Sequence, residues 1–291
     1  MIKVLVICNP FAGGGTAQKV GADYEAFAQQ QNQYNFTFYY TKKPNDLEAI
    51  QQQLDQFQPN VVSIVGGDGT VNEVLNVQDV HQLTIHLVPA GSGNDFHRLV
   101  YGGISMTESI QSVMRTSRDK YDFGLCNDRY FLNGVGIGFD GSVARETMRM
   151  KVPFVSSKWK YWIAIFKNVF FYRSLEVEVE TASEKIKRRL FMIAVANGTE
   201  YGGGFRISPD SDAQDGLLNL ILIDALSPIR RLFNIPKVES GKHLSAPFVT
   251  QYKVDKVRVK SQSLMHAHLD GEQMSGNLFD IQVKQGITFV V

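Results

Sequence analysis

Val61-Val-Ser-Ile-Val-Gly-Gly-Asp-Gly-Thr-Val-Asn-Glu73 joins a short, mostly apolar run to a glycine-rich turn and then to the beginning of a helical pattern. Such a run is typical of a strand that is buried on both faces of a sheet. Glycines let the backbone approach a phosphate, and a helix amino terminus offers unpaired N–H groups and a positive dipole. This stretch therefore predicts a parallel α/β sheet with an anion-binding turn.

The same arrangement recurs through the first 120 residues. The predicted strands are 2–8, 36–40, 61–65 and 85–88, and the predicted helices are 16–31, 46–57, 71–77 and 106–116. Glycine collects after three of these strands, in NPFAGGG (9–15), GGDGT (66–70) and PAGSGND (89–95). Because ligands bind beyond the carboxyl ends of parallel strands, we expect the three loops to converge on one crevice. Thr16 and Asn94 or Asp95 are candidate helix caps.

From Tyr121 onward the pattern is mostly two-residue alternation, which predicts an antiparallel β-sandwich or barrel. The predicted strands are 130–132, 175–180, 189–196, 217–223, 252–260 and 278–283, with one helical interruption at 157–172. The predicted fold class is therefore α/β plus all-β, with an N-terminal parallel-sheet nucleotide domain (1–121), a C-terminal β-sandwich domain (122–279) and a cleft between them. The return of the tail, 280–291, to the first domain is implied by the resemblance described below.

Composition excludes several classes of protein. The chain has 291 residues, a formal net charge of +1 and two cysteines, Cys8 and Cys126. A disulfide scaffold and a nucleic-acid partner are therefore not expected. The first eight residues are too short for a signal peptide, and no apolar stretch reaches the ~20 residues that a membrane span needs. These observations predict a cytoplasmic protein with buried, reduced thiols.

Some motifs leave a purely structural alternative open. GGDGT alone is also a common strand-to-helix turn, and Asp68 within it would repel a phosphate unless Mg²⁺ or water lies between them. The spelling GxGxxG at 136–141 lacks an acidic residue about 20 positions later, so it does not indicate a dinucleotide fold. His266 and His268 share one strand face; a polar strand face is favoured there over a two-histidine metal site.

The ordered set of motifs resembles the catalytic domain of the diacylglycerol kinase and sphingosine kinase family. The first half contributes NPFAGGG, GGDGT followed by Asn72 and Glu73, and PAGSGND. The second half continues the resemblance with GIGFD (136–140), GGGF (202–205), PDSDAQDGLL (209–218) and DGE (270–272). The set covers nearly the whole chain and most resembles the soluble bacterial diacylglycerol kinases, which phosphorylate a lipid hydroxyl with ATP. The family more often has Thr where this chain has Ser92, and the hydroxyl is kept.

This resemblance implies roles for the matching residues. Asp270 is the implied general base, and Glu272 with Asp68 is implied to organise the catalytic Mg²⁺. A second, structural Mg²⁺ is implied at the positions Asp212, Asp215 and the backbone carbonyl of Leu217. The positions implied to line ATP are Asn9, Pro10, Phe11, Ala12, Gly13, Thr41, Gly66, Gly67, Asp68, Gly69, Thr70, Val71, Asn72 and Ser92.

The implied chemistry is physically consistent. Phosphoryl transfer needs alignment, charge neutralisation and a group oriented on the attacking hydroxyl. A primary alcohol is a very weak acid, and an aspartate with an ordinary pKa of about 3.9 cannot remove its proton in advance. Asp270 is therefore expected to orient the hydroxyl and to accept its proton late in the transfer. Closing a cleft between the domains would exclude water as a competing acceptor.

Residues 145–174 suggest how such an enzyme would reach a lipid. They contain seven basic residues against the single acid Glu146, together with both tryptophans and six other aromatic residues. A basic and aromatic helix suits the surface of an anionic bilayer. A helix that covers the second domain with a solvated basic face is the alternative. We expect a cytoplasmic protein that contacts the inner face of the membrane transiently, and the resemblance implies a homodimer.

The function predicted from the sequence is transfer of the γ-phosphate of ATP to diacylglycerol, forming phosphatidic acid. Alternative acceptors are a sphingoid base, ceramide, phosphatidylglycerol and NAD, because NAD kinases share the GGDGT turn. A non-catalytic nucleotide and lipid sensor is a third class. Such a sensor would be expected to lack at least one of the acidic residues, yet Asp68, Asp212, Asp215, Asp270 and Glu272 are all present.

Overall fold

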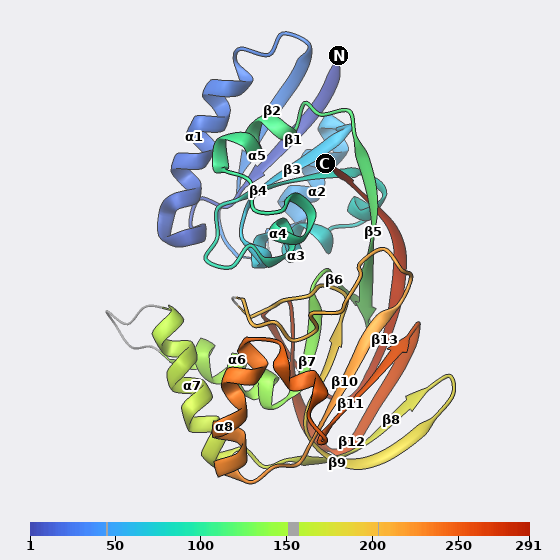
Figure 1. Ribbon diagram of the computed structural model, residues 1–291. Coiled ribbons are helices and arrows are strands. Elements are labelled where there is room, and N and C mark those ends of the chain that lie inside the picture. The colour runs from blue at the N-terminus through green and yellow to red at the C-terminus, as the bar shows by residue number, and fades with distance from the viewer. Residues whose placement is uncertain (45, 151–156, 203) are drawn as a thin grey trace. The chain divides into compact units, whose positions relative to one another are not determined.

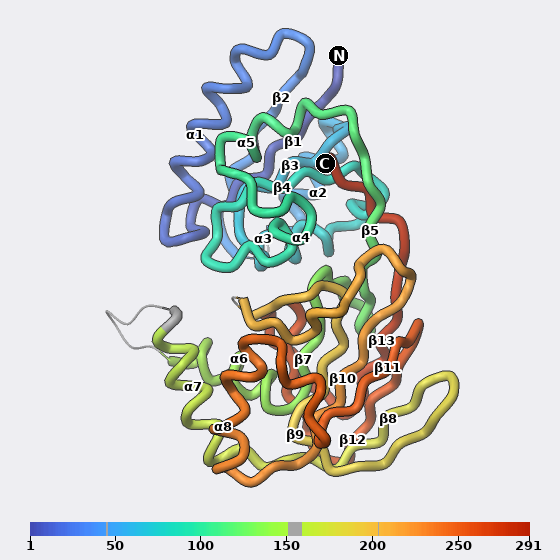
Figure 2. Tube along the Cα trace, in the orientation of Figure 1, coloured from blue at the N-terminus to red at the C-terminus, as the bar shows by residue number. Residues whose placement is uncertain are grey.

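The computed structural model describes residues 1–44, 46–150, 157–202 and 204–291 (Figure 1). The chain divides into two compact units. Unit 1 comprises residues 1–123 and 285–291, and unit 2 comprises residues 124–284. The last residues of the chain return to unit 1 (Figure 2), where Thr288 and Phe289 pair with Thr84 and Ile85.

Unit 1 is built on a parallel sheet. Its strands are β1 (Ile2–Cys8), β2 (Tyr34–Tyr40), β3 (Val61–Gly66), β4 (Thr84–Pro89) and the last residues of β13 (Glu272–Val290). They lie in the order β13-β4-β3-β1-β2, and every pair is parallel. Strand β3 is buried at all six positions, as expected for a strand that is covered on both faces.

Helices cover both faces of this sheet (Figure 1). They are η1 (Ala12–Gly15), α1 (Thr16–Ala28), α2 (Leu47–Phe57), α3 (Asp68–Leu75), η2 (Val80–Gln82), α4 (Asp95–Tyr101) and α5 (Met106–Ser112). One core joins Val4 and Val6 of β1 to Tyr24 of α1 and Ile110 of α5. Helix α2 contacts β1 and α3, and its Ile50 is buried, as are Leu5 and Ile7, the β1 residues that point to the face opposite Val4 and Val6.

Unit 2 is built from antiparallel strands. They are β5 (Arg118–Cys126), which begins in unit 1, β6 (Arg129–Phe131), β7 (Gly134–Gly138), β8 (Leu175–Thr181), β9 (Lys185–Ala196), β10 (Leu218–Asp224), β11 (Val249–Val254), β12 (Lys256–Leu269) and β13. The main order is β11-β10-β9-β7-β12-β13, and β8 bridges β9 and β12. The enclosed core contains Val135, Val195, Leu220, Ala267 and Phe279.

The two predicted folds, a parallel α/β fold and an antiparallel β-rich fold, are confirmed, but two details of the second half are wrong. Helix α7 (Ser157–Phe171) is accompanied by α6 (Phe139–Arg149), α8 (Pro228–Glu239) and the short η3 (Lys242–Ser245), so the helical interruption is not single. Pro236 inside α8 weakens its helical pattern, whereas Pro228 stands at the first position, where proline is compatible with a helix. The strand predicted at 252–260 is two strands, β11 and β12, separated at Asp255. Among the described residues, none of the helices has the length and apolar character needed to span a membrane.

Candidate functional site

The three glycine loops of unit 1 lie against one another. A Cβ placed on Gly91 would lie 2.3 Å from the Cα of Gly67, and a Cβ on Gly13 would lie 2.3 Å from the carbonyl oxygen of Ala90. Real Cβ atoms do not approach so closely, so only glycine permits these contacts. Asn9 joins two of the loops through its side-chain amide, which donates to Thr70 Oγ1 at 3.1 Å. The loops therefore meet at the carboxyl ends of β1, β3 and β4.

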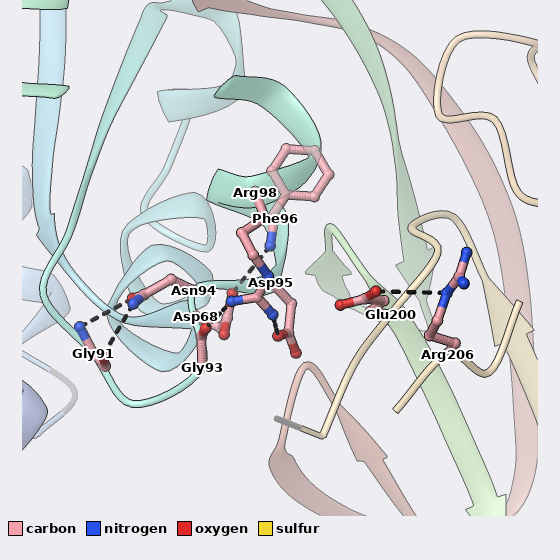
Figure 3. A network of polar contacts seen from close by, with 9 residues as sticks. All are labelled: Asp68, Gly91, Gly93, Asn94, Asp95, Phe96, Arg98, Glu200 and Arg206. Atoms are coloured by element: carbon pink, nitrogen blue, oxygen red, sulfur yellow. Dashed lines mark hydrogen bonds and ion pairs between the residues drawn. The ribbon is translucent and has the colours of Figure 1, made fainter. Parts of the chain in front are cut away.

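Asp68 is the first residue of α3 and connects two of these loops (Figure 3). Its Oδ1 accepts a hydrogen bond from the backbone N–H of Phe96 at 3.3 Å. Its Oδ2 occupies space that a side chain at Gly93 would fill, since a Cβ there would lie 2.5 Å away. The carboxylate is thus held at the amino terminus of one helix and beside the beginning of another, α4.

The PAGSGND loop is braced by residues that the sequence suggested as caps. Asn94 has a positive φ of 60° and makes no side-chain cap bond; its amide instead exchanges two hydrogen bonds of 3.0 Å with the backbone of Gly91 (Figure 3). Asp95 is buried and forms an ion pair with Arg98. Thr16 is likewise no cap, because it is the first residue of α1 and its hydroxyl donates to the carbonyl of Gly13. Asp95 is a charged residue that the sequence singled out only as a cap.

The remaining nucleotide candidates surround these loops. Thr41 is buried, and its N–H donates to the carbonyl of Cys8. The neighbouring loop is tied to α3, because the Asp46 N–H donates to Glu73 Oε1 at 2.6 Å. The buried candidates are Gly66, Thr70, Val71 and Asn72, the half-buried ones Pro10, Ala12 and Gly67, and the exposed ones Phe11, Gly69 and Ser92. All lie in unit 1.

Asp270 and Gly271 form the turn between β12 and β13 in unit 2. Both have positive φ, 47° and 92°, as a two-residue hairpin turn requires. Asp270 is 8% exposed, and its carboxylate accepts three backbone N–H bonds: from Leu132 on Oδ2 at 2.7 Å, and from Asn133 and Gly134 on Oδ1 at 2.9 Å each. Protonating either oxygen would therefore weaken at least one of these bonds. Glu272, the first residue of β13, is half-buried.

The two histidines of β12 have separate partners. His266 lies between Arg145 of α6 and the hydroxyl of Ser275. His268 is buried, with Nε2 3.0 Å from Asp140 Oδ2 and Nδ1 accepting from the Gly271 N–H at 3.3 Å. Within the described residues no group of three His, Cys, Asp or Glu side chains is placed to hold a metal. The polar strand face stays the favoured prediction for this pair.

The implied structural Mg²⁺ positions lie on one turn before β10. Asp212 Oδ1 accepts from the Gln214 N–H, and Asp215 Oδ1 accepts from the Leu217 N–H, each at 3.0 Å. Asp215 Oδ2 lies 2.5 Å from the ammonium of Lys253, which raises the pKa of that lysine. Carboxylate and carbonyl oxygens suit Mg²⁺, so the donor types fit. An ion at Asp215 would, however, compete with Lys253.

Unit 2 also contains apolar spaces. A cavity of about 60 Å³ lies among α6, α7, α8, β9 and β10, lined by residues that include Phe139, Asp140, Tyr201 and His243. The Tyr201 hydroxyl and both ring nitrogens of His243 are buried there without a hydrogen-bond partner among the described residues. The cavity thus combines apolar walls with a few unsatisfied polar atoms.

A groove of about 710 Å³ runs between α7 and α8 on the surface of unit 2. We call its exposed apolar residues the α7–α8 surface: Trp159, Ile163, Phe166, Phe170 and Phe171 of α7, and Leu232 of α8. The sequence identified the aromatic residues of α7 but not the contribution of α8. Residues 151–156 of the basic and aromatic segment lie outside the described residues.

Two family profiles match the chain. The diacylglycerol kinase catalytic domain matches residues 3–126, and the YegS C-terminal NAD kinase beta sandwich-like domain matches residues 133–287, more than half of the chain. The boundary between the matches falls where the α/β strands give way to antiparallel ones.

Individual relatives match over most of their length. A diacylglycerol kinase of Staphylococcus saprophyticus subsp. saprophyticus is 23% identical over 286 residues, covering 96% of this chain and 93% of the relative. A diacylglycerol kinase of Staphylococcus carnosus (strain TM300) is 25% identical over 250 residues, covering 84% and 81%. A crystal structure of a diacylglycerol kinase from Bacillus anthracis str. Sterne aligns with a TM-score of 0.70 at 18% identity, covering 99% of this chain and 96% of that one. That last likeness demonstrates a shared fold.

Proposed function

The chain belongs to the diacylglycerol kinase family, and from this premise we propose that it is a lipid kinase that transfers the γ-phosphate of ATP to the hydroxyl of diacylglycerol, yielding phosphatidic acid and ADP. The observation that carries the proposal is the close packing of the three glycine loops in unit 1. Backbone N–H groups at the beginnings of α3 and α4 suit the phosphates of a nucleotide. Asn9, Thr41, Asn72 and the other loop residues form the proposed ATP site.

Mg²⁺ is the proposed cofactor, and Asp68 is the residue of unit 1 proposed to hold it. The support is the place of Asp68 among the glycine loops, where Oδ1 accepts from the Phe96 N–H and Oδ2 lies so close to Gly93 that a side chain there would displace the carboxylate. The chemistry that the ion supplies when bound is neutralisation of phosphate charge. A structural Mg²⁺ at Asp212, Asp215 and the Leu217 carbonyl is a separate proposal, which requires Lys253 to yield its place.

At the acceptor end, the contacts of Asp270 change the role that we propose for it. Its three amide hydrogen bonds suit a residue that holds the turn in shape rather than one that takes up a proton. Glu272 lies two residues later and is half-buried, so we propose it as the group that orients the hydroxyl and accepts its proton late in the transfer. Asp270 as the base remains the alternative that the experiment below distinguishes.

The lipid side of the proposal rests on the apolar spaces of unit 2. We propose that the cavity bordered by Asp140 and Tyr201 receives part of the acyl region, because His268 links Asp140 to the turn that carries Glu272. We further propose that the α7–α8 surface contacts an anionic bilayer. Exposed aromatic residues suit the interface, and Lys160, Arg173 and Arg230 on or beside the same helices suit its negative charge.

The test is transfer of labelled γ-phosphate from Mg²⁺-ATP to diacylglycerol, ceramide, sphingosine or phosphatidylglycerol in mixed micelles, with NAD as a soluble acceptor. We expect labelled phosphatidic acid. Labelling of another lipid would replace the acceptor, labelling of NAD would overturn the lipid assignment, and ATP binding without transfer to any acceptor would favour a sensor.

Two variants separate the roles of the carboxylates. Glu272→Gln is expected to fold normally and lose activity, because only the proton acceptor is removed. Asp270→Asn turns an amide toward the Leu132 N–H, so it is expected to lose about 1–3 kcal/mol of stability as well as activity. A fully active Glu272→Gln enzyme would return the base role to Asp270.

A further inference from the structure

His268 is the buried histidine of β12, and the proposed reaction assigns no role to its side chain. Resting on the proposed kinase function, we propose that His268 is a positioning residue for phosphoryl transfer: held by Asp140, it fixes the Gly271 amide and thereby the orientation of Glu272. No step of the chemistry passes through its ring.

The turn itself needs an external restraint. Asp270 is a non-glycine residue with φ of 47°, a conformation that L-residues rarely adopt, and Gly271 follows with φ of 92°. Asp270 is restrained by the three amides of residues 132–134. Gly271 is exposed, and its N–H donates to His268 Nδ1. The imidazole is therefore the contact that restrains the half of the turn next to Glu272.

The two partners of His268 determine its tautomer. Nδ1 accepts the Gly271 N–H and so carries no proton, which leaves the proton on Nε2, and that nitrogen lies 3.0 Å from Asp140 Oδ2. Asp140 lies in the first turn of α6, where a helix amino terminus stabilises a carboxylate. The pair thus connects the beginning of α6 to the hairpin turn.

The surroundings are shaped to admit this pair. A Cβ on Gly136 would lie 2.4 Å from Asp140 Oδ2 and 2.5 Å from His268 Nε2, so a side chain at that position would displace the contact. The ring of Tyr201 packs edge-on against His268, with centroids 5.2 Å apart. Gly136 and Asp140 are the first and last residues of the GIGFD motif, which has no part in the proposed nucleotide site. In this proposal the function of the GIGFD motif is to admit and provide the contact with His268 that holds the turn.

The pH dependence of activity distinguishes a positioning histidine from a purely structural one, because protonation of a purely structural histidine would leave kcat unchanged. The charged and titratable groups facing His268 are Asp140 of α6, Asp270 of its own hairpin and the Tyr201 hydroxyl. Burial alone would lower the pKa of His268, but the Asp140 and Asp270 carboxylates raise it above its usual value. A proton on Nδ1 would face the Gly271 N–H donor to donor. Acidification through this pKa is therefore expected to release the turn.

Two substitutions divide the contacts of the ring. In His268→Asn the side-chain oxygen stands near the position of Nδ1 and keeps an acceptor for Gly271, whereas in His268→Gln the amide stands near Nε2 and keeps only the Asp140 contact. His266→Gln is the matched control, because His266 lies on the same strand face but contacts Arg145 and Ser275.

The experiment measures kcat and KM for ATP and lipid against pH, with thermal unfolding to confirm folding. We expect His268→Gln to lower kcat about tenfold with an unchanged KM for ATP, as loss of one hydrogen bond implies. His268→Asn should retain most of kcat and lose the acidic limb of the pH profile, and His266→Gln should behave as wild type. An active wild type with a His268→Gln variant of unchanged kcat and pH profile would overturn the proposal.

Hydrogen exchange of the Gly271 amide tests the same contact without any substrate. We expect faster exchange in His268→Gln than in His268→Asn or wild type. If the wild type phosphorylates no lipid, the proposed function fails, while this exchange still decides whether His268 holds the turn. Equal exchange in all three proteins would refute the positioning role regardless of activity.

Discussion

Substituting Gly91 by alanine tests whether the packed glycine loops form the nucleotide site. The added Cβ would lie 2.3 Å from the Cα and 2.9 Å from the backbone nitrogen of Gly67. Carbon atoms in contact lie about 3.5–4.0 Å apart, so the GGDGT and PAGSGND loops must separate by roughly 1.5 Å. Both neighbours are backbone, and no flexible side chain can move aside to relieve the clash.

The expected effect follows from that displacement. Overpacking of this kind costs about 1–3 kcal/mol of stability, and a misplacement of about 1 Å at a reaction site costs about 10²-fold in rate. We therefore expect Gly91→Ala to bind ATP much more weakly in calorimetry and to lose about 10²-fold in kcat/KM, while it still unfolds cooperatively. Gly276→Ala is the control, because the nearest atom to its Cβ would lie at an ordinary 3.5 Å. Wild-type ATP affinity in Gly91→Ala would refute the assignment of the site.

Three further outcomes are expected. Burial lowers the pKa of His86 to about 3, so the neutral imidazole contributes its full stability only above the unfolded pKa of about 6.5, and this contribution is lost on acidification. In urea unfolding we therefore expect the protein to be about 2 kcal/mol less stable at pH 5 than at pH 7.5. The His86→Gln variant should lose less stability between the same two pH values. In Lys253→Met the ammonium no longer competes for Asp215, so a lower Mg²⁺ concentration should suffice to raise the melting temperature. Lys185→Met, which removes the ion pair with Glu178, should respond to Mg²⁺ as the wild type does. An unchanged Mg²⁺ response in Lys253→Met would argue against a metal at Asp215. Replacing Phe166 and Phe170 by serine should weaken sedimentation with anionic vesicles by at least about tenfold, and Leu278→Ser, which is as exposed as Phe170, should leave it unchanged; equal loss in the control would indicate a nonspecific effect.

Much of unit 1 was predictable because its signals are local. Strands β1 and β3 begin at the predicted residues, since each is a mostly apolar run that leads into a glycine turn. The meeting of the loops followed from topology, because parallel strands deliver their carboxyl ends to one edge. What could not be predicted is how each loop is held. Asn94 had the composition of a cap, yet its positive φ turns the amide back onto Gly91.

Unit 2 was less predictable because its helices alter the burial of its strands. Residues 190–196 of β9 are buried without alternation, since helices and the side chains of Tyr201, Phe205 and Ile207 cover the face opposite the enclosed core. Helix α8 carries Pro236 in its interior, so propensity argued against it, while its contacts with α7 support it. Tertiary packing outweighs local preference at these positions.

The motif DGE illustrates the limit most clearly. When only the sequence is known, either of two acidic residues separated by one glycine could be the proton acceptor. The amides that occupy Asp270 come from residues 136 to 138 positions earlier in the chain, so no local pattern announces them. With these amides in place the two acids have different roles: the Asp270 carboxylate holds the turn in shape, and Glu272 lies at the edge of the turn. The assignment of chemistry to Glu272 therefore depends on where the β6–β7 connection points its N–H groups, and on His268 holding the glycine between the two acids.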